Sequence, residues 1–321
     1  MSSNPLERVC IVGAAGHIGK AFAQALLQTG RHTVTALTRT NGTSQLPEGI
    51  RAVKVDYEDD SSIIEALKGQ QFLVITLSVQ APQNLHGRIA AAAAKAGVPY
   101  VMPNAFGYPI DRDNLDEEDT FAAGVLDQVE EVQRLGISTV VLSCGIWYEW
   151  SLALGEPWFG FTIKDRKVTM FDDGKRILTV STWEQCGRAL AGLLSLPQSG
   201  VSTCVDDFKN GHVLINSFRV SQRDMLDSLH RVMGTTDSDW EITYESVEKR
   251  MQDGAEELKR GVRTGFAKIL YGRAFHVDKP NSDYAATRTM ANGILGLPKE
   301  ELDDATRRAV NMVESGWTPF A

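Results

Sequence analysis

Hydrophobic positions in the first half of the chain alternate between short strand-like runs and longer segments with helical spacing. The apolar runs predict strands at Val9–Val12, His32–Thr38, Ala52–Val55, Phe72–Thr76, Tyr100–Met102 and Thr139–Ser143. Amphipathic spacing between them predicts helices at His17–Thr29, Ser62–Leu67, Asn84–Ala96 and Thr120–Leu135. Repeated β-α-β units imply a parallel sheet with helices on both faces. The predicted fold class is therefore α/β, with a Rossmann-type doubly wound parallel sheet in a dinucleotide-binding domain over residues 1–150.

The pattern is less regular in residues 151–321, which we expect to form a smaller C-terminal substrate region. An Asp-Gly turn at Asp172–Lys175 lies between two β-rich runs, and this arrangement predicts a hairpin. Ser181 and Glu184 have the spacing of a capping box. A helix is therefore predicted over about residues 182–196, and we expect it to pack on the Rossmann sheet.

Composition narrows the class of protein. The 321 residues are 43% hydrophobic and 23% charged, which is ordinary for a globular protein that buries a core without disulfides. The formal net charge of −8 repels phosphate backbones, so no nucleic-acid partner is expected. The chain opens on polar residues and has no apolar run of membrane-spanning length, which predicts a cytoplasmic protein without membrane association.

Cysteine and histidine usage adds two expectations. The four cysteines are far apart and form no C-x-x-C pair, so we interpret them as reduced structural thiols, with a regulatory disulfide as the alternative. The six histidines show no metal-ligand spacing, and no metal is expected.

The first candidate binding site lies at the turn between the first predicted strand and the first predicted helix. Gly13, Gly16 and Gly19 form a G-x-x-G-x-x-G pattern there. The first glycine permits a tight turn, the second lets a pyrophosphate approach the backbone, and the third lets helix and strand pack closely. The N-terminus of the helix then offers N–H groups and a positive dipole end to phosphate. The pattern predicts dinucleotide binding, because the strand, helix and next strand lie at the required distances.

The end of the second predicted strand indicates which dinucleotide is bound. NAD-binding proteins usually place a carboxylate there for the ribose hydroxyls, whereas this chain has Arg39 and no acidic residue near it. An arginine can pair with a 2′-phosphate, so NADP(H) is the expected cofactor. Asp56, after the third strand, either contacts the adenine end or caps the following turn. The expected cofactor-binding residues are Gly13, Ala15, Gly16, His17, Ile18, Gly19, Arg39, Asp56, Thr76, Leu77, Ser78, Pro103, Asn104, Phe106 and Gly107. The ring of His17 is expected to face the cofactor or solvent.

Three ordered motifs resemble those of a known family: GAAGHIG at Gly13–Gly19, PNAFG at Pro103–Gly107 and GIWYEWSLA at Gly145–Ala153. They are similar to the NmrA-like, isoflavone-reductase-like branch of the atypical short-chain dehydrogenases, and two later stretches resemble its fungal members. The resemblance implies a Rossmann domain with a smaller substrate region, NADPH in the cleft, and reduction of phenolic or polyketide-like molecules. It also implies an alternative, because the family contains a nucleotide-sensing regulator.

One expected group of that family is missing. Its reductases usually carry a lysine near the start of the helix after PNAFG, as a proton relay, and the equivalent position here is Val125. The Tyr-x-x-x-Lys pair of ordinary short-chain dehydrogenases is absent as well. Tyr108 and Tyr148 follow predicted strands at the carboxyl edge of the sheet, where ligands bind, and are candidate catalytic residues. For each of them, ordinary packing or hydrogen bonding is the alternative.

Aromatic residues gather after the last predicted strand of the sheet. They either line an apolar pocket for a flat substrate or form a hydrophobic seam between the two regions. The expected substrate-pocket residues are Trp147, Tyr148, Trp150, Trp158, Phe159 and Phe161.

The sequence therefore favours an NADPH-dependent reductase of a small aromatic or polyketide-type metabolite, with a small-molecule substrate as its partner. Two alternatives stay open. The chain is otherwise an NADP(H)-sensing regulatory protein that binds a protein partner without turnover, or a non-redox isomerase or cyclase on the same fold. The substrate and the oligomeric state do not follow from the sequence.

Overall fold

The computed structural model describes residues 4–116, 118–200, 203–276, 278 and 282–319. These residues divide into two compact units. Unit 1 contains the residues up to Ser143, then Trp183–Ile215 and Met290–Leu297. Unit 2 contains Cys144–Thr182, Asn216–Thr289 and the residues from Pro298 onward. The first crossing between the units comes after Ser143, near the predicted boundary at residue 150, and the chain crosses again after Thr182, Ile215, Thr289 and Leu297.

Unit 1 is built on a seven-stranded parallel sheet in the order β11-β6-β5-β4-β1-β2-β3. This arrangement confirms the predicted doubly wound fold. The seventh strand, β11, was not predicted from the sequence. It lies parallel to β6 at the edge of the sheet. The strands are β1 (Arg8–Val12), β2 (Thr33–Arg39), β3 (Arg51–Val55), β4 (Phe72–Ile75), β5 (Tyr100–Met102), β6 (Ser138–Ser143) and β11 (Gly211–Leu214).

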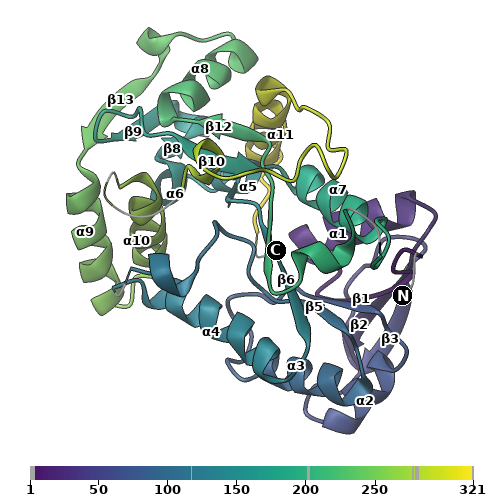
Figure 1. The fold of residues 1–321 in the computed structure, drawn as a ribbon. Helices are drawn as coiled ribbons and strands as arrows, with labels where there is room; N and C mark the ends of the chain where they lie inside the picture. The colour runs from purple at the N-terminus through teal and green to yellow at the C-terminus, as the bar shows by residue number, and fades with distance from the viewer. Residues whose placement is uncertain (1–3, 117, 201–202, 277, 279–281, 320–321) are drawn as a thin grey trace. The chain divides into compact units, whose positions relative to one another are not determined.

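Helices cover both faces of this sheet (Figure 1). One face carries α1 (His17–Gln28) and α7 (Trp183–Leu194), which pack against each other. The other face carries α2 (Asp60–Leu67), α3 (Leu85–Ala96) and α4 (Thr120–Arg134). The core beneath these three helices is made of buried aliphatic residues from alternate positions of the strands, such as Val12, Leu73 and Val101. Because the sheet is covered on both faces, its strands are apolar almost throughout, and this made them predictable.

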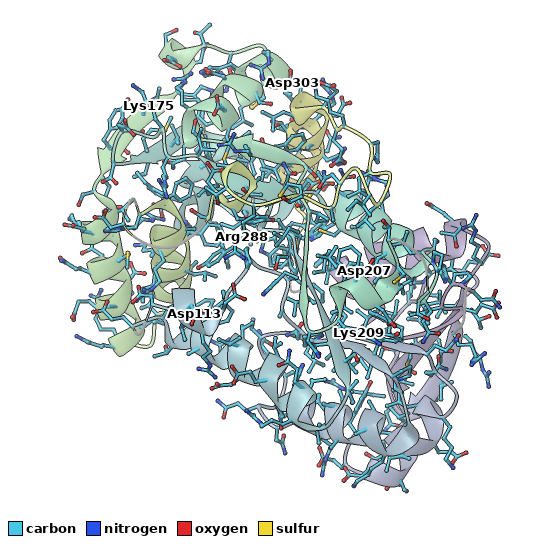
Figure 2. The ribbon with its side chains drawn as sticks, in the orientation of Figure 1. Asp113, Lys175, Asp207, Lys209, Arg288 and Asp303 are labelled. Atoms are coloured by element: carbon cyan, nitrogen blue, oxygen red, sulfur yellow. The ribbon has the colours of Figure 1, made fainter. Side chains whose placement is uncertain are left out.

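Short 3₁₀ segments precede elements of unit 1. They are η1 (Arg112–Asn114), which precedes α4, and η3 (Val205–Phe208), which precedes β11. Figure 2 labels Asp207 and Lys209 in the segment that leads into β11. Asp207 accepts a hydrogen bond from the backbone N–H of Cys204 at 2.8 Å, and Lys209 pairs with Asp206 at 2.8 Å. These contacts fix the chain as it enters the seventh strand.

Unit 2 contains two three-stranded sheets, β12-β10-β7 and β13-β9-β8. The strands are β7 (Ile146–Trp147), β8 (Phe161–Thr162), β9 (Lys167–Phe171), β10 (Leu178–Ser181), β12 (Phe218–Val220) and β13 (Glu241–Glu245). The helices are α5 (Tyr148–Ala153), α6 (Glu156–Phe159), α8 (Gln222–Met233), α9 (Val247–Lys259), α10 (Thr264–Phe275) and α11 (Leu302–Glu314), with 3₁₀ segments η2 (Ile163–Asp165), η4 (Asp237–Asp239) and η5 (Tyr284–Ala286). Asp303 of α11, labelled in Figure 2, pairs with Arg231 of α8 at 2.7 Å and links these two helices.

Two local predictions in unit 2 are wrong. The predicted hairpin does not form, because β9 pairs with β8 and β13 whereas β10 pairs with β7 and β12. The turn itself is present, with left-handed backbone at Asp172 and Gly174, but the two strands diverge into different sheets. The predicted capping box at Ser181 is absent because Ser181 ends β10 and α7 begins at Trp183. Turn and cap residues indicate where the chain bends, and long-range pairing decides which strands meet.

Other expectations concern features that the structure reports directly. All four cysteines are buried. Across the described segments, no helix is long and apolar enough to cross a membrane. The same segments contain no group of three or more His, Cys, Asp or Glu side chains arranged to hold a metal ion.

Candidate functional site

Two of the three glycines in the turn after β1 are required by close packing. Gly13 has a left-handed φ of +83°, and a Cβ there would lie 2.0 Å from the carbonyl oxygen of Thr76. A Cβ on Gly19 would lie 2.2 Å from the carbonyl oxygen of Gly13. Both distances are far below any van der Waals contact, so another residue at either position requires β4 or α1 to move. These two glycines bring β1, α1 and β4 together.

Gly16 differs from its neighbours in the turn. It is exposed, its φ of −72° and ψ of 167° suit any residue, and a Cβ there would meet only the Gly13 carbonyl oxygen, at 3.3 Å. A side chain at this position would move the Gly13 carbonyl oxygen by a few tenths of an ångström, so packing restricts Gly16 far less than Gly13 or Gly19. Gly16 is also the N-cap of α1, and no described side chain caps this end of the helix. The turn thus leaves open space in front of backbone N–H groups, which fits a phosphate group.

The side chains next to Gly16 are all partly or fully buried. The ring of His17 stacks on the indole of Trp183, with centroids 4.9 Å apart and planes 7° from parallel. Ile18 is buried, and Ala15 is half-buried. This stacking was not expected from the sequence, because His17 and Trp183 lie far apart in the chain. These residues therefore offer a nucleotide backbone groups and little else.

Two polar residues lie at the carboxyl ends of β2 and β3. Arg39 is the last residue of β2 and is exposed, and no described acidic side chain forms an ion pair with it. Its guanidinium group is therefore available to an anion. Asp56 follows β3, and its Oδ1 accepts a hydrogen bond from the backbone N–H of Glu58 at 2.9 Å. This contact gives Asp56 a turn-capping role, and its contact with the adenine end of a nucleotide stays a prediction.

The amide side chain of Asn104 joins the segments that follow β4 and β5. The N–H of Leu77 donates to Asn104 Oδ1 at 3.1 Å, and Asn104 Nδ2 donates to the Leu77 carbonyl oxygen at 3.2 Å. Thr76 ties the same edge to β1, because its Oγ1 donates to the carbonyl oxygen of Val12 at 2.8 Å. These bonds hold the two segments expected to flank a nicotinamide at a fixed separation.

His86 supports this pairing, and the sequence analysis did not single it out. The backbone N–H of Asn104 lies 3.4 Å from His86 Nε2, which acts as the acceptor. Burial lowers the pKa of His86 to about 4, so the ring is neutral near pH 7 with its proton on Nδ1. Its place on the apolar face of the predicted helix gave no sign of this role.

The rest of the PNAFG segment is firmly packed, apart from its last residue. Pro103 is buried, and the ring of Phe106 packs against Phe22 of α1 with centroids 5.5 Å apart. Gly107 is exposed, and a Cβ there would have no atom within 4 Å. On the β4 side, Ser78 is exposed and accepts a hydrogen bond from the N–H of Gln80 at 3.2 Å.

The position of the missing lysine lies beside the same segment. Val125 of α4 packs against a small cluster formed by Ala105, Val129 and Val141. Ala105 belongs to PNAFG, so a side chain at position 125 faces the edge of the sheet where a cofactor is expected. Tyr108 is half-buried in the loop that follows, and its catalytic role stays a prediction.

Tyr148 lies inside the core of unit 2. It is fully buried, its hydroxyl group lies 2.7 Å from Thr306 Oγ1, and its ring packs edge-on against Phe218. Burial raises the pKa of this phenol above its usual range. These contacts favour the packing interpretation of Tyr148 over a role as proton donor.

The aromatic residues expected to line a pocket separate into two groups in unit 2. Phe159 and Phe161 are fully buried core residues, and Trp158 packs edge-on against Tyr271 beside them. Trp147 and Trp150 are only partly buried. They pack edge-on against each other, and Trp150 also packs edge-on against Trp317. Of the residues proposed for the pocket, Trp147, Trp150 and Trp158 are the partly buried ones, and their contact with a substrate stays a prediction.

A buried carboxyl group lies next to these tryptophans. Glu149 is 3% exposed, and its Oε1 accepts a hydrogen bond from Arg308 at 2.8 Å. Its other oxygen has no hydrogen-bond partner among the described residues. Burial raises the pKa of Glu149 to about 7, and the nearby guanidinium of Arg308 opposes that rise.

The chain is similar in sequence to known proteins. Residues 5–148 match the NmrA-like family. The chain is 27% identical over 306 residues to the oxidoreductase aprR of Aspergillus flavus, covering 92% of this chain and 96% of that protein. These similarities confirm the resemblance that the motifs predicted.

Solved structures share the fold over nearly the whole chain. One is titled as the crystal structure of an isoflavone reductase, with a TM-score of 0.71 at 18% identity, covering 94% of this chain and 99% of that one. Another, AtPrR2 with NADP⁺ and (+)pinoresinol, has a TM-score of 0.69 at 17% identity, covering 96% of this chain and 99% of that one.

Proposed function

We propose that this chain, whose residues 5–148 match the NmrA-like family, is an NADPH-dependent reductase of a small aromatic or polyketide-type metabolite. The observation that carries the proposal is the turn after β1. Packing restricts Gly13 and Gly19 far more than Gly16, where open space lies in front of the uncapped N-terminus of α1. A ligand with a phosphate group accounts for a glycine at a position that packing restricts little.

Arg39 supports the choice of NADPH over NADH. Its exposed guanidinium group has no acidic partner among the described residues, and it ends the strand next to β1. A 2′-phosphate would form charge-assisted hydrogen bonds with this group, whereas a ribose diol would not. The solved structure of AtPrR2, which shares the fold, contains NADP⁺.

The other residues of the proposed site have roles that follow from their positions. NADPH supplies a hydride when it is bound. Thr76, Leu77 and Ser78 would flank it at β4, and the segment Pro103–Gly107 would bracket the nicotinamide. The bonds between Asn104 and Leu77 keep these two segments apart by a fixed distance. Trp147 and Trp150 would offer aromatic faces to a flat substrate.

Relatives support a redox reaction on a small molecule. The oxidoreductase aprR is similar over almost its whole length, and the solved structures that share the fold include an isoflavone reductase. Val125 favours a second candidate, a nucleotide sensor without turnover, because an apolar side chain beside Ala105 cannot donate a proton.

The experiment that tests the proposal has two stages. Calorimetric titration with NADPH and NADH comes first, with Gly16→Val as the control that should not bind. NADPH oxidation is then followed by nicotinamide absorbance over a panel of hydroxylated aromatic ketones and enones. We expect binding selective for NADPH and oxidation equal to the product formed. Tight binding without oxidation by any compound would favour the sensor, and a product isomeric with its substrate would favour an isomerase or cyclase.

A further inference from the structure

Three polar side chains of unit 1 form a continuous chain of hydrogen-bonding groups. Ser143 Oγ lies 2.8 Å from His212 Nδ1, and His212 Nε2 lies 3.3 Å from Asp111 Oδ1. The order carboxylate, imidazole, hydroxyl is one in which a proton can pass from group to group. None of the three stands out in the sequence, because they lie on separate segments and only the sheet brings them together.

Each member is held by a different element. Ser143 is the last residue of β6, and His212 lies in β11 directly opposite Val141 of β6. Asp111 lies in the loop after β5. The next residue, Arg112, anchors that loop to α4 through ion pairs with Asp127 and Glu130, both at 2.7 Å. Asp113, labelled in Figure 2, belongs to the same anchored turn η1. The chain of groups is therefore fixed by the sheet on one side and by α4 on the other.

Exposure falls steadily along this chain of groups. The side chain of Asp111 is 47% exposed, that of His212 is 19% exposed, and Ser143 is 1% exposed. The carboxylate thus meets water, and the hydroxyl lies inside the protein at the carboxyl end of β6. Ligands of open parallel sheets bind at this edge. The three groups lead from solvent toward the place where a substrate is expected.

The three groups lie on the face of the sheet that α4 covers. Val125, the position at which related reductases carry a lysine, is on the same face. Val141 packs in the cluster that Val125 of α4 adjoins. Ser143 is two residues after Val141 in the same strand, and His212 is the partner of Val141 in the parallel ladder. All three side chains therefore point to the face covered by α4. A proton donor on this face would replace the lysine that is absent at position 125.

We propose that Asp111, His212 and Ser143 form a proton relay in which the Ser143 hydroxyl donates to the substrate. The proposal rests on the reductase function proposed above and names its proton donor. Ser143 would be the catalytic residue in this scheme, because its hydroxyl group would donate to the substrate oxygen. His212 and Asp111 are relay residues that act through it.

The proton and electron balance is complete for reduction of a carbonyl group. The substrate carbon receives a hydride, with its electron pair, from bound NADPH, and the carbon–oxygen double bond becomes single. The substrate oxygen takes the proton of Ser143 Oγ, and Oγ takes the Nδ1 proton of the His212 imidazolium. The neutral ring keeps its Nε2 proton, so it must turn over to bring its bare nitrogen to the side of Asp111, where water protonates it and the Asp111 carboxylate stabilises the cation. The products are the alcohol and NADP⁺, with one proton taken from solvent.

Substitution of each group provides the kinetic test. His212→Gln and Ser143→Ala should each lower kcat by about 10²–10⁴-fold, the usual contribution of general acid catalysis. Asp111→Asn should lower kcat less, because it removes only the partner of the imidazole. The affinity for NADPH should stay within about twofold in all three. The matched control is His230→Gln, which removes a histidine that pairs with Asp237 at 2.8 Å in unit 2 and should leave kcat unchanged.

Two further readouts separate a relay from a merely structural link between β6 and β11. Added imidazole should restore part of the activity of His212→Ala and none of that of Ser143→Ala. In the nucleotide-free protein, ¹H–¹⁵N correlations of the histidine rings should show that Asp111→Asn alters the ring protonation of His212 and leaves His230 unchanged. Asp111 is half exposed, so we expect Asp111→Asn to fold. This variant can therefore be measured even if His212→Gln does not fold.

The outcomes distinguish the relay from the proposed function. If the wild-type protein oxidises NADPH and His212→Gln does so at the same rate, the relay is overturned and the reductase stands. If imidazole fails to rescue His212→Ala, or if the ring of His212 does not respond to Asp111→Asn, the relay is overturned as well. If the wild-type protein reduces nothing, both proposals fail.

Discussion

Replacing Gly13 and Gly16 one at a time separates the two roles that the glycine turn combines. Gly13→Ala forces a left-handed backbone on alanine, which costs roughly 1–2 kcal/mol. It also places a Cβ 2.0 Å from the Thr76 carbonyl oxygen, so β4 must shift, and overpacking of this kind costs about 1–3 kcal/mol more. Together these terms destabilise the protein by roughly 2–5 kcal/mol, which for a chain of this size lowers Tm by about 3–7 °C.

Gly16→Ala should leave stability nearly unchanged. Its backbone torsions suit alanine, and the nearest atom to the new Cβ is 3.3 Å away. The smaller entropy of the unfolded chain offsets any crowding, so the change in unfolding free energy should stay within about 1 kcal/mol. The new methyl group nevertheless occupies the space assigned to the pyrophosphate. NADPH affinity should fall by more than about tenfold, or about 1.4 kcal/mol, and Gly16→Val should abolish binding.

Differential scanning calorimetry and NADPH titration on the same preparations measure both effects. The reasoning predicts that Gly13→Ala loses stability, whereas Gly16→Ala loses only affinity. It is refuted if Gly16→Ala binds NADPH as tightly as the wild-type protein, because the open space would then have no ligand. It is also refuted if Gly16→Ala lowers Tm as much as Gly13→Ala does.

Three further predictions concern separate residues. Arg39→Ala should weaken NADPH binding by roughly 1.5–3 kcal/mol, the value of a charged hydrogen bond, and should barely change NADH binding; equal losses in calorimetric titrations would refute the assignment. Val125→Lys should broaden the range of carbonyl substrates reduced, with rates rising up to about 10²-fold for poor substrates, as steady-state assays over the ketone panel would measure. Burial raises the pKa of Glu149 to about 7 from 4.5, so the folded state holds the extra proton and stability falls as pH rises through that window, by at most about 1.4 kcal/mol per pH unit. Glu149→Gln should flatten the dependence of Tm on pH between these values, and an unchanged curve would contradict the assignment.

The doubly wound sheet was predictable because its information is local. Strands covered on both faces read as uninterrupted apolar runs, and the helices between them carry their own spacing. β11 escaped prediction because it has only four residues, includes the polar His212, and pairs with a strand from far earlier in the chain. The hairpin was mispredicted for a related reason, because a turn at Gly174 does not specify which strands pair on either side of it.

The candidate site divides in the same way. Roles that depend on a single backbone position, such as the left-handed conformation of Gly13, follow from the spacing of the motif. Roles that depend on contacts across the fold do not. The sequence could not indicate that the ring of His17 stacks on Trp183, or that Tyr148 is sealed against Thr306. Nor could it show that His212 lies between Ser143 and an exposed carboxylate.

The central claim, that this protein transfers a hydride, is tested most directly by isotope transfer. NADPH deuterated at C4 on either face, in separate preparations, is incubated with the protein and the panel of hydroxylated aromatic ketones and enones. Mass spectrometry then measures deuterium in each product. The account predicts that deuterium from one face alone appears in a reduced product, in an amount equal to the NADPH oxidised. Tight NADPH binding with no deuterium transferred from either face to any compound would contradict it.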